Sequence, residues 1–440
     1  MESRRAPVRV GVLSFHNSKE TKALCNAVAD LGHEPAWLRP ENTNIHAAAD
    51  GLTVDPDVDV VINRLLLSRA DRPLEELELA NSIASLRPMV NEPPAVLTAI
   101  HKFATATRLS ANGIPTPESY LALTGPELEA GREHFDQAIQ KAGIGTHGET
   151  IRQIREGTSL PPKFGTKRTF LQEYIDQEDN QSDLRAYVVG GDVIGAMERA
   201  TPDDDWRANV ARGGTTRDVT DEIPSPVLTL AAEATDALGL DVAGVDFMEH
   251  EGDWKVLEVN PTAGFKGLFG ATGHSPAPSI AQLAIERVGG RVDADRVAAL
   301  ATQLDDSVPD CKPTRRAASG QPTVGLTEEV VVNGQQSSTT TTAKVDTGAK
   351  RTSMGIDLAS DIGAGPIQSS TKVRHSSHSS SKTRPLVDVE VLLEDRWHTL
   401  TVSVENRSHM SHQLLLGRDL LTDYEIDLSG DEDATPTSEE

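Results

Sequence analysis

Cysteine and aromatic side chains are scarce in this sequence. Cys25 and Cys311 are its two cysteines, and Phe, Trp and Tyr together make up 4% of the 440 residues. Two cysteines so far apart in the chain provide neither a disulfide framework nor the spacing of a metal site, which favours a reducing compartment. No apolar run is long enough to span a bilayer, and the basic start passes directly into an alternating strand rather than a signal peptide. We therefore expect a cytoplasmic protein that does not bind membranes.

Basic residues are outnumbered by acidic ones. The chain has 42 Lys and Arg against 67 Asp and Glu, a net charge of −25 that is spread along its whole length. A surface of this sign repels phosphate backbones, so we exclude general nucleic-acid binding. The composition is typical of a halophilic protein, because high salt screens repulsion among the acids. The alternative is a mesophilic protein that is merely acidic.

The pattern of apolar residues divides the chain, which is too long for a single core. The first part alternates strands and helices, with a strand at residues 8–12 and a helix that ends at Gly32. The last part has five candidate strands and predicts an all-β unit, in which we expect the Ser/His tract 369–381 to be mobile. We predict an α/β domain at 1–94, a second α/β domain at 95–290, a linker at 291–322, a β-domain at 323–429 and an acidic disordered tail at 430–440.

The segment VAGVDFMEHEGDWKVLEVN predicts a hairpin that carries three oxygen ligands, Asp246, Glu258 and Asn260. Glu258 and Asn260 share one face because side chains alternate along a strand. If the turn is centred on Gly252, Asp246 lies opposite Glu258, with Cβ atoms roughly 5 Å apart. Two carboxylates and an amide among apolar residues suit Mg²⁺, with Mn²⁺ as the alternative cation. The competing interpretation is a solvated polar face.

Candidate phosphate-binding groups occur in two other segments. Lys141 precedes glycines at 143, 145 and 148, whose N–H groups could cover a polyphosphate. The spacing also fits the dinucleotide motif GxGxxG, but no strand–loop–helix unit or ribose-binding acid accompanies it. The P-loop motif of Walker-type ATPases is absent. Arg207 and Asn209 lie before a glycine pair, where arginine suits phosphate or carboxylate oxygens, unless they belong to an ordinary surface loop.

Read in order, eight segments resemble the ATP-grasp ligases of the RimK/LysX group over residues 1–290. The segments are Lys102, GIPTPES, Lys141 with GTHG, LQEYI, SDLRAYVVGG, RANVARGG, AGVDF and LEVNPTAGFKGL. The resemblance implies an α/β (α+β) ATP-grasp fold preceded by a βα pre-ATP-grasp domain. Members of this group join a carboxylate to an amine through an acyl phosphate made from ATP.

The resemblance also implies roles for individual residues. It places Lys102 and Lys141 at the nucleotide phosphates, Glu173 and Tyr174 in the hinge around adenine, Asp183 near the nucleotide, Arg207 and Asn209 at the reacting phosphate, and Mg²⁺ on Asp246, Glu258 and Asn260.

The C-terminal segments AKVDTGAKRTS and LLLGRDLL resemble a retropepsin-like barrel, a small domain associated with RimK and labelled a zinc protease. The resemblance implies that Asp346 is a catalytic aspartate. An aspartic site needs two carboxylates, so a single DTG motif would require a homodimer. The zinc motif HExxH is absent, and we expect His375 and His378 to be solvated. The alternative is an inactive domain that recognises a peptide or dimerises the ligase.

These inferences together predict an ATP- and Mg²⁺-dependent carboxylate–amine ligase. Its partners would be an amino acid such as glutamate and a carboxylate acceptor, for example a protein tail or a small molecule. The alternative is a retropepsin-like peptidase or peptide-binding regulator in which the ATP-grasp part is accessory. Either way, we expect a homo-oligomer.

Overall fold

The computed structural model divides into two compact units, Met1–Pro313 and Thr314–Glu440, which are described separately below. The unit boundary falls inside the expected linker 291–322. The structure describes residues 6–49, 51–70, 72–145, 151–154, 159–164, 167–175, 182–200, 215–250, 252–313, 322–365, 367–374 and 381–427.

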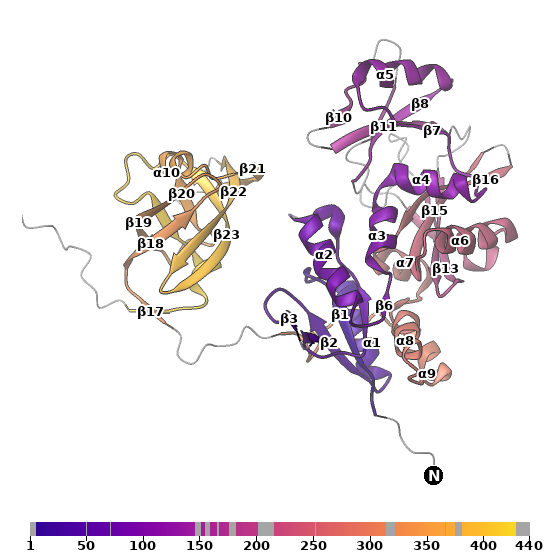
Figure 1. Ribbon diagram of the computed structural model, residues 1–440, viewed down its shortest axis with the longest axis horizontal. Helices are drawn as coiled ribbons and strands as arrows, with labels where there is room; N and C mark the ends of the chain where they lie inside the picture. Colours follow the sequence, from indigo (N-terminus) through magenta and orange to yellow (C-terminus); the bar gives the residue numbers. More distant parts are fainter. Residues whose placement is uncertain are drawn as a thin grey trace, which may run out of the picture. The chain divides into compact units, whose positions relative to one another are not determined.

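The first unit begins with a parallel sheet in the order β2-β1-β5-β6, of which β1, β2 and β6 are labelled in Figure 1. β1 is buried on both faces, as expected for a parallel strand that helices cover from both sides. Ser18 caps helix α1 by accepting a hydrogen bond from the backbone N–H of Thr21 at 3.1 Å. The elements of this part are β1 Arg9–Leu13, α1 Lys19–Asp30, β2 Glu34–Leu38, β3 Asn44–Ala48, β4 Gly51–Asp55, β5 Val60–Asn63, α2 Pro73–Ala84 and β6 Met89–Val90.

A small antiparallel sheet follows, in the order β10-β11-β8-β9, with β7 paired to β11. β8 carries Lys141, which pairs in register with Phe170 of β11. The elements are α3 Pro93–Ile100, α4 Lys102–Ala111, β7 Ser119–Tyr120, α5 Gly125–Ala130, β8 Ala138–Ala142, β9 Ile151–Gln153, β10 Lys163–Phe164 and β11 Lys167–Glu173.

A second antiparallel sheet has the order β14-β13-β12-β15-β16. Leu184 and Ala186 of β12 pack in the same apolar cluster as helix α6, whereas Tyr187 and Val189 join the cluster of helix α7. Odd-numbered residues of β12 therefore face away from α6, and this face carries the polar side chains described below. The elements are β12 Ser182–Val189, β13 Asp192–Ala200, β14 Thr215–Asp218, α6 Ser225–Ala237, β15 Val242–His250, β16 Asp253–Asn260, α7 Phe265–Thr272 and α8 Ala277–Arg287.

Much of the expected linker is folded onto the first unit. Helix α9, Ala294–Ala301, buries Val297 and Ala301, an i,i+4 pair that the sequence interpretation missed. Further on, Asn26 donates hydrogen bonds to the carbonyls of residues 305 and 307. The thiol of Cys311 is hydrogen-bonded to that of Cys25, so the two cysteines that are far apart in sequence are neighbours in space.

The second unit contains a closed six-stranded barrel. Its strands follow the order β18-β19-β24-β20-β23-β22, and β22 pairs back to β18. β21, Ile367–Arg374, pairs with β22 outside the ring. Residues 369–374 are therefore strand, where we had expected a mobile tract, because the long β22 offers them a pairing edge. The other elements are β17 Thr323–Val324, β18 Thr327–Asn333, β19 Ser338–Val345, β20 Ser353–Gly355, α10 Ile356–Asp361, β22 Ser381–Leu393, β23 Arg396–Glu405, β24 Leu414–Leu416, α11 Arg418–Leu421 and β25 Glu425–Ile426.

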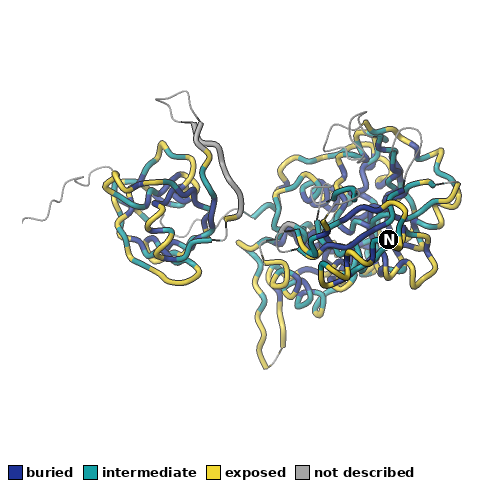
Figure 2. The backbone as a smooth tube through the Cα atoms, turned by 90° about the horizontal axis from the view of Figure 1, so that it is seen from above, coloured by how far each residue is buried: buried dark blue, intermediate teal, exposed yellow. Residues whose placement is uncertain are grey.

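Buried backbone is concentrated in the strands at the centre of each unit (Figure 2). No helix among the described residues has the length and apolar character needed to cross a membrane.

Candidate active site

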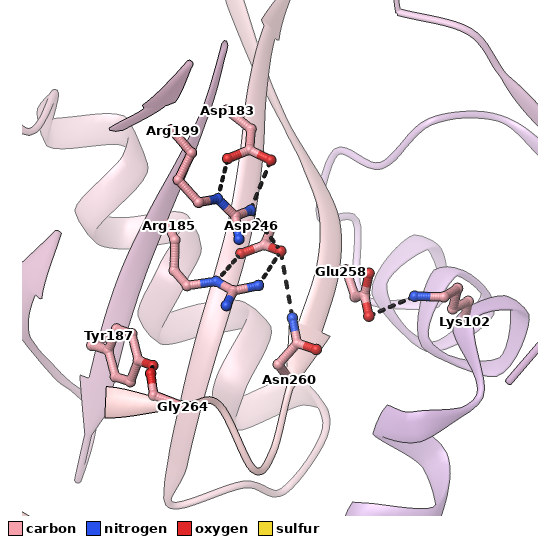
Figure 3. Close-up of polar contacts among 9 residues, drawn as sticks. All are labelled: Lys102, Asp183, Arg185, Tyr187, Arg199, Asp246, Glu258, Asn260 and Gly264. Atoms are coloured by element: carbon pink, nitrogen blue, oxygen red, sulfur yellow. Dashed lines mark hydrogen bonds and ion pairs between the residues drawn. The ribbon is translucent and has the colours of Figure 1, made fainter. Parts of the chain in front are cut away.

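The β15–β16 hairpin brings two carboxylates together. Asp246 pairs in register with Glu258, as predicted, but by another route than a turn centred on Gly252. His250 pairs with Asp253, a register that would set Asp246 against Leu257, and an irregularity between Asp246 and Phe247 shifts the pairing to Glu258. Asn260 lies on the same face, with its Nδ2 at 3.4 Å from Asp246 Oδ2. With its amide in the other orientation, Asn260 donates to Glu258 at 3.1 Å. Asp246 and Asn260 are thus in contact, and the Glu258 carboxylate of the same hairpin points toward Lys102 (Figure 3).

Two arginines from neighbouring strands neutralise the buried acids. Arg185 of β12 donates to both oxygens of Asp246, at 2.5 and 2.6 Å. Arg199 of β13 does the same for Asp183, at 2.5 and 2.7 Å, and lies 3.0 Å from Asp246 (Figure 3). Burial raises the pKa of Asp183 to about 6. Burial also acts to raise the pKa of Asp246, but Arg185 and Arg199 outweigh it and lower that pKa to about 2.

Lys102, the first residue of helix α4, contacts the acid Glu258. Its Nζ lies 2.5 Å from Glu258, and its side chain is 11% exposed. The position of Lys102 is fixed by its backbone, because His101 caps α4 and the Lys102 N–H donates to the Gly143 carbonyl at 2.8 Å. The start of α4 is thereby tied to the glycine loop that follows β8.

Lys141 has a neutral partner instead of an acid. Its Nζ donates to Gln172 Oε1 at 2.5 Å. Burial, with the neighbouring charge of Lys102, lowers the pKa of Lys141 to about 8. Its charge is thus available to an anionic ligand, and holding that charge in the absence of a ligand is costly.

A cavity of about 540 Å³ joins these groups. Lys141, Asp183, Arg185, Arg199, Asp246, Glu258 and Asn260 line it together with Glu173, Tyr174 and Ile175. The Glu173 carboxylate accepts from Lys255 at 2.8 Å and from the Glu118 N–H at 3.1 Å. Because its side chain is engaged, Glu173 can contribute mainly backbone atoms to a ligand in the cavity.

Some candidates lie outside the described residues, and some lining residues were missed. Arg207, Asn209 and residues 146–148 fall outside, as do His375 and His378. The sequence interpretation missed Arg185 and Arg199. The available signal was an arginine two positions after Asp183 in an otherwise apolar strand, since alternate residues share a face.

The donor set fits magnesium under one condition. Two carboxylates and an amide oxygen are ligands that Mg²⁺ takes. However, Arg185, Arg199 and Lys102 already balance the charges of Asp183, Asp246 and Glu258. Among the described residues, no group of three His, Cys, Asp or Glu side chains is arranged to hold a metal ion. The residues therefore fit a cation that arrives with the negative charge of phosphates.

The fold and this site define an ATP-grasp domain, and comparison with known proteins agrees. Residues 99–282 match the RimK-like ATP-grasp domain family. A solved structure described as ATP-grasp ligase PsnB with minimal precursor, Mg and ADP aligns with a TM-score of 0.51 at 20% identity, covering 65% of this chain and all of that one. Residues 99–282 are therefore similar to the RimK-like ATP-grasp domain, and the expected ATP-grasp fold of this part is confirmed.

Two relatives are similar in sequence. A tetrahydromethanopterin:alpha-L-glutamate ligase of Methanocaldococcus jannaschii is 33% identical over 190 residues, which are 41% of this chain and 64% of that protein. A probable alpha-L-glutamate ligase 2 of Hahella chejuensis is 27% identical over 301 residues, which are 64% of this chain and 96% of that protein. This chain thus spans just under two thirds of the first relative and nearly all of the second.

Proposed function

We propose that this protein is an ATP- and Mg²⁺-dependent ligase that activates a carboxylate as an acyl phosphate and joins it to the amine of an amino acid. The observation that carries the proposal is that Asp246, Glu258 and Asn260 line one cavity together with Lys141, Arg185 and Arg199, while Lys102 pairs with Glu258. Phosphoryl transfer requires positioning and charge neutralisation rather than a covalent protein nucleophile. This cavity supplies both.

Each charged group has a task in this proposal. Lys102 and Lys141 bind nucleotide phosphates, and Arg185 and Arg199 keep Asp246 ionised and fixed in direction. Mg²⁺, held by Asp246, Glu258 and Asn260, supplies positive charge at the phosphate oxygens. The backbone of residues 173–175 contacts adenine, with Asp183 near the nucleotide. Arg207 and Asn209 complete the reacting end.

Glutamate is the amino acid that we propose. Both relatives described above are named as alpha-L-glutamate ligases, and a relative of Sulfolobus acidocaldarius, 28% identical over 194 residues, is named a glutamate–LysW ligase. The acceptor would be a carboxylate on a small molecule or on a protein tail.

The test is ADP formation by the purified chain with ATP, Mg²⁺ and a panel of amino acids, before and after Glu258→Gln. We expect glutamate to stimulate the wild type, and Glu258→Gln to lower that rate about 100-fold or more, because it removes one charge of the cation site. Glu249→Gln is the matched control, since Glu249 is exposed on the same hairpin outside the cavity lining. Equal activity of wild type and Glu258→Gln would contradict the metal assignment.

The C-terminal barrel supports a second candidate function, a peptidase or peptide-binding module. Asp346 follows β19, is half-buried, and accepts hydrogen bonds from the backbone N–H groups of Gly348 and Ala349 at 2.8 and 3.2 Å. A peptidase would need Asp346 from two protomers. Asp346→Asn should then abolish cleavage of a peptide library while sparing ATP-dependent ligation. If the protein is a monomer and cleaves no peptide, the peptidase is excluded and the peptide-binding module remains.

A further inference from the structure

Arg64 is a buried cation whose charge has no carboxylate partner among the described residues. It follows β5, is 7% exposed, and lines the cavity of the ATP-grasp site. Its Nη1 donates to the Ala263 carbonyl at 3.3 Å, and its guanidinium lies over the Phe265 ring at 5.1 Å from the centroid. Its Nε is buried and has no hydrogen-bond partner. These two contacts hold the side chain in place, and its Nε–H remains available to donate a hydrogen bond.

The other arginines of this unit show what is missing at Arg64. Arg185 and Arg199 each have a bidentate carboxylate. Arg39 also stacks on an aromatic ring, that of Trp37, but Glu41 lies 2.6 Å from its Nε. An uncompensated buried charge costs several kcal/mol, so proteins rarely retain one unless a ligand compensates it. Burial lowers the pKa of Arg64, which reflects this same cost.

Glu20 is the acid that interacts electrostatically with Arg64, and its carboxylate is engaged elsewhere. Glu20 interacts with Arg64 at longer range, and its Oε1 accepts a hydrogen bond from the Phe265 N–H at 3.2 Å. Glu20 thus stays at the start of α7 rather than pairing with Arg64. The N-terminal domain supplies part of the cavity wall, and besides Arg64 the residues there are Ser14, Ser18, Glu20, Leu66 and Ser68. The unpaired guanidinium therefore faces a polar part of the cavity.

The proposed reaction leaves one anion without a partner. The carboxylate that is activated must reach the cation site at Asp246, Glu258 and Asn260. An α-amino acid that reacts through its amine keeps its own carboxylate unreacted, and glutamate keeps two. A carboxylate enclosed in this cavity needs a fixed cation, and an arginine fork suits carboxylate geometry.

We propose that Arg64 binds a non-reacting carboxylate of the incoming amino acid and so sets its position for amide formation. This assignment rests on the proposed ligase function. Arg64 donates to the carbonyl of Ala263, and Ala263 follows the last residue of the hairpin, Asn260, by three positions. An amino acid bound at Arg64 would therefore lie next to the activated acyl group. Arg64 acts here as a specificity-determining residue and takes no part in nucleotide binding.

The experiment is calorimetric titration of the full chain, saturated with Mg²⁺ and a non-hydrolysable ATP analogue, with L-glutamate, L-glutamine and L-isoglutamine. We expect Arg64→Gln to weaken glutamate binding about 10- to 100-fold, the range for a lost charge-assisted hydrogen bond. Affinity for the ATP analogue should be unchanged. The amide analogue that lacks the contacted carboxylate should bind wild type weakly and be insensitive to Arg64→Gln. Glutamine lacks the side-chain carboxylate and isoglutamine lacks the α-carboxylate. The analogue that behaves in this way therefore shows which carboxylate Arg64 contacts.

Three comparisons guard against a merely structural effect. Arg64→Lys keeps the charge without the fork, and should recover part of the affinity even if Arg64→Gln folds poorly. Arg39→Gln removes a comparable stacked arginine outside the cavity, and should leave glutamate binding unchanged. In turnover assays Arg64→Gln should raise the KM for glutamate more than it lowers kcat. Equal weakening of all three ligands, or unchanged glutamate binding, would overturn the role of Arg64. A wild type that binds no amino acid would instead overturn the proposed function.

Discussion

The ATP-grasp site and the C-terminal barrel hold their acids in different ways. Asp183 and Asp246 are 7% and 6% exposed and take their hydrogen bonds from arginine side chains. In the barrel, Asp346 is half-buried and Asp419 is exposed, and both accept from backbone N–H groups. The first arrangement is a charge network that is balanced before any ligand arrives. In the second, backbone N–H groups hold the carboxylates, which stabilise turns.

The largest expected difference between the two regions is in folding stability. Asp246→Ala leaves the buried Arg185 without an acid, whereas Arg199 keeps Asp183, and should cost about 3–5 kcal/mol in the free energy of unfolding. Asp419→Ala removes hydrogen bonds from the Thr352 N–H and hydroxyl at an exposed position, and should cost about 1–2 kcal/mol. Urea denaturation followed separately for each unit measures both. Equal costs would contradict the contrast between the regions.

The hairpin could be predicted because its information is local. Gly252 marks the turn, and the short separation of the two strands leaves few possible pairings for Asp246; a one-residue shift between Asp246 and Phe247, which the sequence does not announce, sets Asp246 against Glu258. Arg185 reaches Asp246 through the pairing of β12 with β15, strands about sixty residues apart in sequence, and no local pattern fixes that register. Arg64 lies still further from the hairpin. Long-range pairing therefore explains why the ligands were predicted and their arginine partners were not.

The linker and the cysteines show the same limit. Composition favoured a linker at 291–322, but α9 buries Val297 and Ala301. Cys311 interacts with Cys25, although the two residues lie near opposite ends of the first unit's sequence. Alternating strands predicted an all-β unit, and the barrel itself was an implication of the retropepsin-like resemblance. The closure of the barrel by β18 on β22 depends on contacts that alternation does not specify. Local pattern gave the elements, and tertiary packing decided their partners.

The wild type and Lys141→Arg should differ in the pH dependence of nucleotide binding. Because burial lowers the pKa of Lys141 to about 8, Lys141 is protonated below that pH and loses its charge above it. Binding of the ATP analogue should be constant below about pH 8 and weaken up to about tenfold per pH unit above it. Lys141→Arg keeps its charge throughout, so its profile should be flat over this range, whatever its absolute affinity. Parallel profiles for the two proteins would exclude Lys141 as the titrating group.

Salt should act on the surface of the protein and spare the buried network. Screening of the net charge of −25 predicts that the melting temperature rises with KCl up to molar concentrations. The difference in stability between wild type and Asp246→Ala should stay within about 0.5 kcal/mol over the same range, because buried pairs are screened little. A melting temperature independent of salt would contradict the halophilic interpretation, and a difference that shrinks with salt would place the network in solvent.

The smallest expected effect tests where the first region ends. The Cys25 thiol donates a hydrogen bond to Cys311 and so lowers the pKa of Cys311, helped by the Trp37 N–H, although burial opposes it. The same bond, together with burial, raises the pKa of Cys25. Iodoacetamide should therefore modify the half-buried Cys311 before the buried Cys25, since the thiolate is the reacting form.

Cys25→Ala distinguishes a packed segment from a free one. It removes the donated hydrogen bond, so the pKa of Cys311 should rise and its alkylation at neutral pH should slow by a few-fold, measured by mass spectrometry of the peptide. Cys25→Ser is the matched control, because its hydroxyl can still donate to Cys311 and should preserve most of the rate. If neither variant changes the rate, residues 302–313 do not rest on α1. The first region would then end at α9 and the linker would begin there.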